Sequence, residues 1–277
     1  MIIEAGLTSK RIEKYFAEGK RFDGRALDEF RDIEIECGLS KKAEGSAKVK
    51  IGGTEVWVGV KIEATTPYPD SPDKGNLMVT AELTPMSHSK YELGPPKFNA
   101  IELGRLVDRG IRESKIIDLE KLCIKKGEKV WGVIIDVYSV NDDGNLLDAA
   151  FIGALAALRS AKLPFYDEEL GKIDYDKPAK DALPLTKNNP INFCVYKIGE
   201  SIFLDPTFEE EVASDGRLVI GAISGKELKI CSMQKSGDTA ISEEMFGKML
   251  DLAEKKDKTF FGEIQKKIDS AIKALNK

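Results

Sequence analysis

The sequence predicts an α+β fold made of two lobes, each with a mixed sheet packed against helices. Three observations lead to this prediction. Residues 47–64 form two alternating apolar runs that Gly52-Gly53 separates, which is typical of a β-hairpin. Residues 130–140, VWGVIIDVYSV, form a long apolar strand. Residues 146–160, LLDAAFIGALAALRS, form a helix that is apolar around most of its surface. Adjacent antiparallel strands mixed with helices are characteristic of the α+β class.

Composition limits the class of protein. The chain has 277 residues, of which 42% are hydrophobic and 32% charged, as in a globular protein with a sizeable core. Its net charge of −5 argues against a protein that coats nucleic acid through its overall field. Any contact with a polyanion must therefore use a local basic patch. The sequence has no apolar run long enough to span a membrane and no signal peptide, so we expect a cytoplasmic protein without membrane contacts.

Few residues suit metal or nucleophilic chemistry. His88 is the only histidine, and Cys37, Cys123, Cys194 and Cys231 are scattered without a C-x-x-C pair. This distribution disfavours a zinc site. A histidine-based catalytic mechanism could use only His88, which lies in a predicted loop. No glycine-rich nucleotide loop occurs between a strand and a helix. We expect this chain to bind no metal and no cofactor.

The elements around the hairpin are short. Ile12, Tyr15 and Phe16 share one face of a helix that is predicted over residues 9–18 and ends at Gly19. After the hairpin, residues 65–76 contain three prolines and form a loop. The next strand is NLMVTAEL, which ends at residue 83.

Residues 101–114, IELGRLVDRGIRES, predict a half-buried helix. Arg105, Arg109 and Arg112 fall within a narrow sector of this helix at about 100° per residue. Asn99 precedes the helix as a good N-cap, and Glu102 stands three residues later, as in a capping box. The sequence therefore predicts a row of arginines along one side of the helix.

Two interpretations of this row stay open. The helix contains acids at ion-pair spacing, which would make the row a solvated, self-paired face: Glu102 to Arg105, Asp108 to Arg112 and Arg109 to Glu113. Alternatively, the row is an anion site, because guanidinium forks suit phosphate oxygens.

The second half of the chain again mixes strands and helices. Residues 161–190 are irregular, contain four prolines and mark a boundary between lobes. Four short strands follow, in FCVYKI, SIFLD, RLVIGAI and ELKICSM, and two helices close the chain. We therefore divide the chain into an N-terminal helical extension (1–20), a core domain (21–190) and a C-terminal domain (191–277).

Five stretches together resemble the RNase PH-like family. They are KRFDGR (20–25), the hairpin with its two glycines, IELGRLVDRGIRES, the turn DGNLLDAA (143–150) and LDPTFEEE (204–211). The resemblance extends from about residue 20 to 260. RNase PH-like proteins degrade RNA from its 3′ end with phosphate as the attacking group and release nucleoside diphosphates. The resemblance implies a two-layer RNase PH-like fold and assembly into six-membered rings.

The chain departs from the active pattern at the phosphate site. In active members an Asp-Gly turn is followed by three positions: first glycine, then serine or threonine, then arginine. The helix N-terminus and this arginine hold the attacking phosphate. Here the turn is followed by Asn145, Leu146 and Leu147. Leucine side chains donate neither hydrogen bonds nor charge to phosphate.

A second departure lies in LDPTFEEE. Active members place two aspartates six residues apart near this strand end, for metal or general-acid work. Asp205 fits the first position, but Glu211 stands at the second. Either Asp205 retains a chemical role, or it caps a turn while the glutamates form a solvated face.

These departures narrow the resemblance to the non-catalytic RNase PH-like subunits of archaeal exosomes. Such subunits alternate with a catalytic RNase PH-like partner, three copies each, in a hexameric ring that RNA-binding cap subunits accompany. The resemblance implies that Arg105, Arg109 and Arg112 hold phosphates of single-stranded RNA beside the partner's active site, where inorganic phosphate is expected. Arg21 and Arg25 are secondary RNA-binding candidates, or ties between their loop and the core. No residue of this chain is expected to be catalytic. The alternatives are an active phosphate-dependent exoribonuclease and a purely structural ring subunit without RNA contacts.

Overall fold

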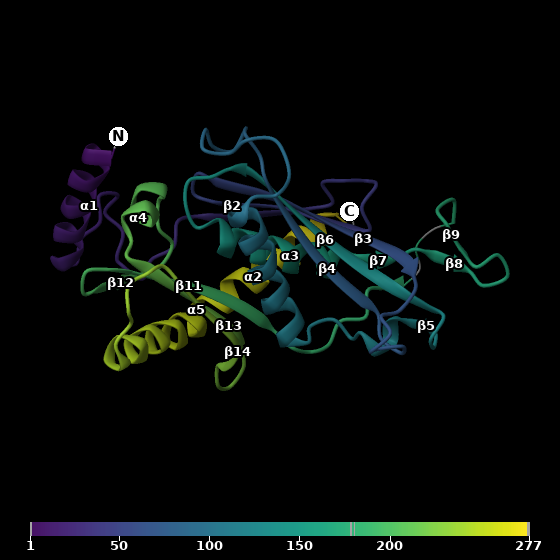
Figure 1. Ribbon diagram of the computed structural model, residues 1–277. Coiled ribbons are helices and arrows are strands. Elements are labelled where there is room, and N and C mark those ends of the chain that lie inside the picture. The colour runs from purple at the N-terminus through teal and green to yellow at the C-terminus, as the bar shows by residue number, and fades with distance from the viewer. Residues whose placement is uncertain (1, 178, 180, 276–277) are drawn as a thin grey trace.

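The computed structural model describes residues 2–177, 179 and 181–275 (Figure 1). Its larger sheet has the strand order β1-β2-β3-β6-β4, with β5 paired to β6. The strands of this sheet are β1 (Ile33–Cys37), β2 (Gly45–Ile51), β3 (Thr54–Thr65), β4 (Asn76–Leu83), β5 (Cys123–Lys125) and β6 (Lys129–Asn141). Only β4 and β6 run parallel, and the other pairs are antiparallel. β6 is therefore an interior strand, which explains its long apolar run.

The β2–β3 hairpin follows the predicted alternation. Ile51 pairs with Thr54, so Gly52 and Gly53 alone form the loop. Gly52 has a positive φ of 56°, a conformation that glycine adopts without a steric cost. Val56, Val58, Val60 and Ile62 are buried on the inner face, as the spacing predicted.

A second sheet is built from the C-terminal part of the chain. Its order is β12-β11-β13-β14, with all neighbours antiparallel. These strands are β11 (Pro190–Ile198), β12 (Ser201–Phe203), β13 (Gly216–Ile223) and β14 (Lys229–Ser236). The irregular segment that connects the two sheets along the chain contains two small strand pairs: β7 (Lys162–Leu163) with β10 (Asp181–Ala182), and β8 (Phe165–Asp167) with β9 (Lys172–Asp174). Earlier in the chain, a short 3-10 helix, η1 (Glu120–Leu122), precedes β5.

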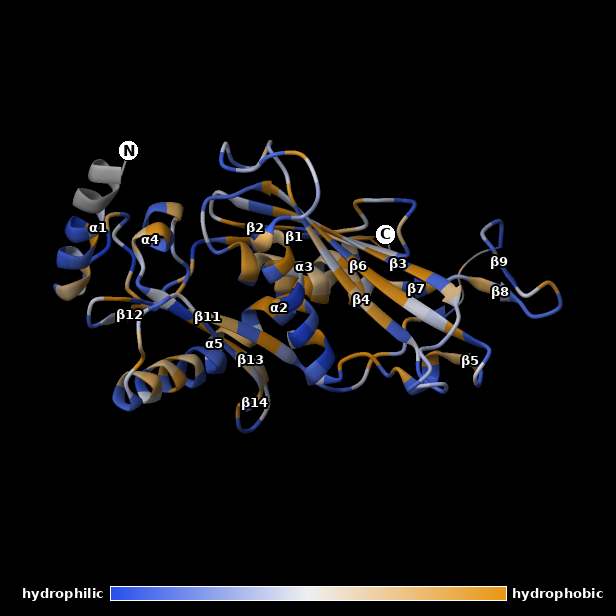
Figure 2. Cartoon of the chain, viewed as in Figure 1, coloured by the Kyte–Doolittle hydropathy of each residue, from blue (hydrophilic) through white to orange (hydrophobic). Residues whose placement is uncertain are grey.

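Two helices lie between the sheets. α2 (Phe98–Ser114) and α3 (Leu146–Ser160) each contact strands of both sheets (Figure 1). The hydrophobic colouring of α3 continues into the strands beside it in Figure 2. α3 approaches β3 closely, because a Cβ added at Gly153 would stand 2.7 Å from Cγ2 of Val58. This packing makes one continuous core and confirms the predicted α+β class.

Three further helices complete the fold. α1 (Ile2–Ala17) packs on α4 (Phe208–Ala213) and β12. α5 (Glu243–Leu275) runs across β1 of the large sheet and β11 of the second one. None of the described helices is both long and apolar enough to cross a membrane.

The ends of the chain differ from the prediction. α1 begins at Ile2 instead of residue 9, although it ends before Gly19 as expected. The two closing helices are one helix, α5, because its buried face continues without interruption through the position of Gly262. The residues of that face are Met245, Met249, Ala253, Asp257, Phe260, Ile264 and Ile268. Packing along this face outweighs the cost of about 1 kcal/mol for a glycine inside a helix.

The predicted capping box at the start of α2 is wrong. α2 begins at Phe98 with Lys97 as its N-cap, and no side chain caps it. The capping box belongs to α4 instead, where Thr207 and Glu210 exchange side-chain and backbone hydrogen bonds. Glu102 is therefore free to contact another part of the chain.

Candidate nucleic-acid interface

The arginine row lies on the exposed side of α2. Arg105, Arg109 and Arg112 are all exposed, whereas Leu106 and Ile111 of the same helix are buried. The helical period therefore separates the arginines from the core, as the sequence predicted.

Arg112 has partners within its own lobe. Its Nη2 donates to Oδ1 of Asp108 at 2.7 Å, and its Nε donates to Oδ2 of the same carboxylate at 3.0 Å. Nη2 also donates to the carbonyl of Leu77 at 3.0 Å, on β4 at the end of the sheet order. The self-paired interpretation therefore describes Arg112, which ties α2 to an edge strand.

Arg105 and Arg109 differ from Arg112. Within the described part of the chain, neither forms an ion pair. The acid expected beside Arg105 is engaged elsewhere, because Glu102 accepts from Nη2 of Arg217 at 2.9 Å and from Oγ of Ser236 at 3.2 Å. The tertiary structure thus leaves two exposed guanidinium groups whose donors can bind an external anion.

Arg21 and Arg25 tie their loop to the core. The Arg21 side chain is fully buried, and its donors reach the Glu210 carboxylate and the carbonyls of Leu204 and Asp205. Arg25 donates to carboxylate oxygens of Asp23 at 2.7 Å and Asp205 at 2.8 Å. Nη2 of Arg25 has no partner but is buried, so neither guanidinium group presents a free donor to an RNA phosphate, and the loop-to-core interpretation describes both residues.

Asp205 is a buried counterion. It is fully buried, and Arg31 donates to both of its carboxylate oxygens, at 2.8 and 2.9 Å. Arg25, the side-chain amide of Asn145 and the backbone N–H of Arg31 also donate to this carboxylate, each at 2.8 Å. Burial alone would raise the pKa of Asp205, but the hydrogen bonds and charge of Arg31 outweigh it and lower the pKa. Asp205 is thus held ionised between two arginines, which suits a structural ion better than a proton donor.

Glu211 occupies the N-terminus of α3. Asn145, which precedes the helix, has a left-handed φ of 58°, and its backbone N–H donates to Oε2 of Glu211 at 2.9 Å. The hydroxyl of Tyr196 donates to Oε1 at 2.9 Å, and Nη1 of Arg217 lies 3.4 Å from the same atom. The N-terminus of a helix attracts anions, and here the chain supplies its own carboxylate.

A cavity of about 350 Å³ lies beside this carboxylate, between α2, the start of α3 and β13. Leu146 and Leu147 line it where an active member would present polar side chains. Its charged lining residues are the cations Lys90 and Arg217 and the acids Glu102, Asp142, Glu211 and Asp215. Lys90 pairs with Asp142 at 2.9 Å, and Arg217 pairs with Glu102. Acids outnumber cations here, so the cavity disfavours a phosphate.

Two residues of this region were not predicted from the sequence. Arg31 lies outside the KRFDGR stretch and carries no local signal of its contact with Asp205. Arg217 begins the otherwise apolar strand RLVIGAI, which is an unusual place for an unpaired charge. That pattern predicts a buried partner but does not identify Glu102 or Glu211.

Comparison with known proteins places the chain in a family. The model of the 3′ exoribonuclease family, domain 1, matches residues 29–164, and the model of domain 2 of that family matches residues 189–256. The chain is 46% identical over 239 residues to exosome complex component Rrp42 of Methanocella arvoryzae, with 86% of this chain and 88% of that protein covered. It is 43% identical over 278 residues to the protein of the same name from Thermococcus onnurineus, with 99% and 98% covered.

Solved structures agree with this assignment. A chain of the Archaeoglobus fulgidus exosome with RNA bound to the active site gives a TM-score of 0.83 at 40% identity, with 92% of this chain and 97% of that chain covered. A chain of an archaeal exosome core gives 0.81 at 38% identity, with 95% and 98% covered. The expected RNase PH-like fold is thereby confirmed, and the chain belongs to the RNase PH-like 3′ exoribonuclease family.

Proposed function

We propose that the chain is a non-catalytic ring subunit of a cytoplasmic archaeal exosome, which degrades single-stranded RNA from its 3′ end. In this proposal it alternates with a catalytic RNase PH-like partner, three copies of each, and RNA-binding cap subunits join the ring. The similarity to exosome components and to exosome structures supports this assignment. Inorganic phosphate binds at the partner's active site, and this chain orders that site and contributes to the RNA groove.

The Glu211 contact is the observation that argues most strongly for a non-catalytic subunit. A phosphorolytic site must hold an attacking phosphate, and the helix N-terminus that would hold it already binds the Glu211 carboxylate. Leu146 and Leu147 add no donors, and the acids of the cavity repel a second anion. These features favour the non-catalytic proposal over an active exoribonuclease.

Arg105 and Arg109 support a role in RNA binding. They stand four residues apart, which places their Cα atoms about 6 Å apart along the helix axis. This separation is comparable with the spacing of adjacent phosphates in an extended strand. Contacts of this kind carry no base information, so binding is expected to be independent of sequence and sensitive to salt. Unpaired arginines favour this role over a purely structural subunit.

The direct test is release of nucleoside diphosphates from single-stranded RNA in the presence of phosphate. We expect no release by this chain alone and strong release once the catalytic RNase PH-like subunit is added. The catalytic RNase PH-like subunit without this chain is the control, because it shows how much release that subunit gives by itself. Phosphate-dependent release by the pure chain would contradict the non-catalytic proposal.

A gain of phosphate binding should follow from removing the internal carboxylate. Glu211→Ser frees the Asn145 N–H and Arg217, so phosphate is expected to stabilise this variant but not the wild-type chain. At a phosphate concentration ten times the Kd, the stabilisation is about 1.4 kcal/mol. Thermal unfolding at several phosphate concentrations measures the effect, with constant ionic strength.

Glu209→Ser is the matched control for this experiment, because Glu209 is exposed on the same helix. It should respond to phosphate as the wild-type chain does. If Glu211→Ser gains no stability from phosphate, the Glu211 carboxylate is not what excludes the anion.

A further inference from the structure

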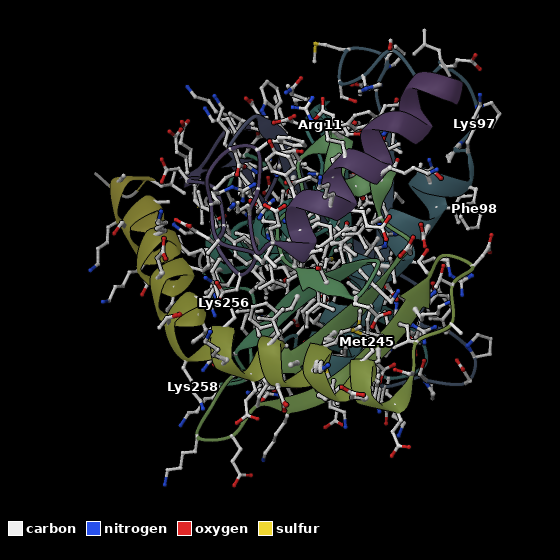
Figure 3. The ribbon with its side chains drawn as sticks, turned by 90° about the vertical axis from the view of Figure 1, so that its left-hand side faces the viewer. Arg11, Lys97, Phe98, Met245, Lys256 and Lys258 are labelled. Carbon is white, nitrogen blue, oxygen red and sulfur yellow. The ribbon has the colours of Figure 1, made fainter. Side chains whose placement is uncertain are left out.

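Two exposed apolar side chains continue the arginine row toward the start of α2. Phe98 is 74% exposed and Ile101 is 51% exposed. Phe98 stands seven residues before Arg105, which is two turns and returns it to within about 20° of the same direction. Figure 3 shows Phe98 projecting outward from the end of α2, next to Lys97. One stripe of the helix therefore carries an aromatic ring, an aliphatic side chain and then the two arginines.

The packing of the chain does not account for this exposure. The core-facing side of α2 consists of other residues, among them Leu103, Leu106 and Val107. Among the described aromatic contacts, none involves the ring of Phe98. An exposed phenylalanine beside unpaired cations is therefore available to an external ligand.

We propose that Phe98 stacks on a base of the single-stranded RNA whose phosphates bind Arg105 and Arg109, with Ile101 as an apolar contact between them. This inference rests on the proposed function and adds a base-contacting residue to it. Aromatic rings stack on any base, so the contact is compatible with degradation of RNA irrespective of sequence. Phe98 lies about 10 Å along the helix axis from Arg105, close enough for the same strand to reach both.

The neighbouring cavity explains why a base, and not a phosphate, lies at this end of the stripe. Phe98 and Tyr91 both line the cavity that contains Glu102 and Glu211. These acids repel phosphate, so the neutral base is the part of the nucleotide that can approach them. The charged backbone then stays on the arginine end of α2.

The same stripe would fit a protein partner less well. A protein surface that covered Phe98 would also bring Arg105 and Arg109 out of water, which is costly unless it supplies acids for both. A strand of RNA supplies phosphates and bases together along its length.

The experiment uses the full chain, alone and assembled with its RNase PH-like partner, without phosphate so that the RNA stays intact. The variants are Phe98→Leu, Phe98→Trp, and Arg105→Ala with Arg109→Ala, and Phe22→Leu removes an exposed ring elsewhere as the matched control. Binding of an oligoribonucleotide is measured across salt concentrations. A 5-iodouridine oligonucleotide is crosslinked, and the crosslinked residue is identified by mass spectrometry.

We expect Phe98→Leu to weaken binding about fivefold or more without changing the salt dependence, and Phe98→Trp to retain it. Crosslinks should map to Phe98, and an oligonucleotide with abasic sites should bind wild-type and Phe98→Leu chains equally. The arginine variant should instead reduce the salt dependence.

Four results would overturn the inference. Unchanged binding in Phe98→Leu, together with a reduced salt dependence in the arginine variant, would remove Phe98 from the site but leave the proposed function intact. No effect of either variant, or no RNA binding by the assembled wild-type ring, would contradict both the inference and the RNA-binding role of this chain. Loss of assembly in Phe98→Leu, detected by size-exclusion chromatography, would identify the stripe as a protein interface.

Discussion

Asp205→Asn is expected to lower the free energy of unfolding by about 3–5 kcal/mol, because it removes the fully buried carboxylate that pairs with the largely buried side chains of Arg25 and Arg31. Their other acidic partners, Asp23 and Asp143, are partly exposed and cannot replace it. Asp205 is fully buried, and Arg25 and Arg31 both bond to its carboxylate. The variant side chain keeps one acceptor oxygen, but its amide group faces guanidinium donors. Denaturant unfolding of the full chain at neutral pH measures the effect.

Asp28→Asn is the matched control for Asp205→Asn. Asp28 pairs with Lys255 at 3.1 Å, and both side chains are partly exposed, so this substitution should cost no more than about 1 kcal/mol. Equal effects of the two substitutions would contradict the role of Asp205 as a buried counterion.

Acidification should affect the same interaction with a defined sign. Because the folded state lowers the pKa of Asp205, its contribution to stability is fully present above the unfolded pKa of about 3.9. The contribution is lost as the pH falls through the lower folded pKa. Asp205→Asn should therefore lack this part of the acid sensitivity.

Arg105→Ala combined with Arg109→Ala is expected to weaken RNA binding by the ring that this chain forms with its catalytic partner. The expected loss is about tenfold for each arginine. A hydrogen bond to a charged group contributes about 1.5–3 kcal/mol, and neither arginine forms an ion pair within the described chain that would keep it from RNA. The slope of log K against log salt should fall by about 0.7 for each lost phosphate contact with a single strand. Filter binding across salt concentrations measures both quantities.

Assembly of the ring should survive this double substitution, because both side chains are exposed and α2 packs through its other face. Lys248→Ala combined with Lys258→Ala removes two exposed positive charges from α5 and serves as the control for net charge; Figure 3 labels Lys258. Unchanged RNA binding and turnover in the double variant would refute the groove role and favour the purely structural alternative.

Local patterns in the sequence were sufficient for most of the secondary structure. The hairpin turn at Gly52, the strand β6 and the helix α3 each follow from the periodicity and turn residues of their own short segment. The pattern failed where packing extends an element, as in α5, whose buried face carries one helix past Gly262. It also failed at Asn99, because α2 already begins at Phe98 and Asn99 lies inside its first turn.

The sequence by itself determined that the arginines of α2 lie on one exposed face, because the helical period alone separates them from Leu106 and Ile111. Only the tertiary structure decided which of them are paired. Arg112 meets an acid four residues away, whereas Glu102 is drawn from Arg105 to Arg217 on a distant strand. The same holds for Glu211, which reaches the start of α3 across 66 residues of chain. Periodicity is a local property, but an ion pair depends on which distant segments the fold brings within reach of a charged group.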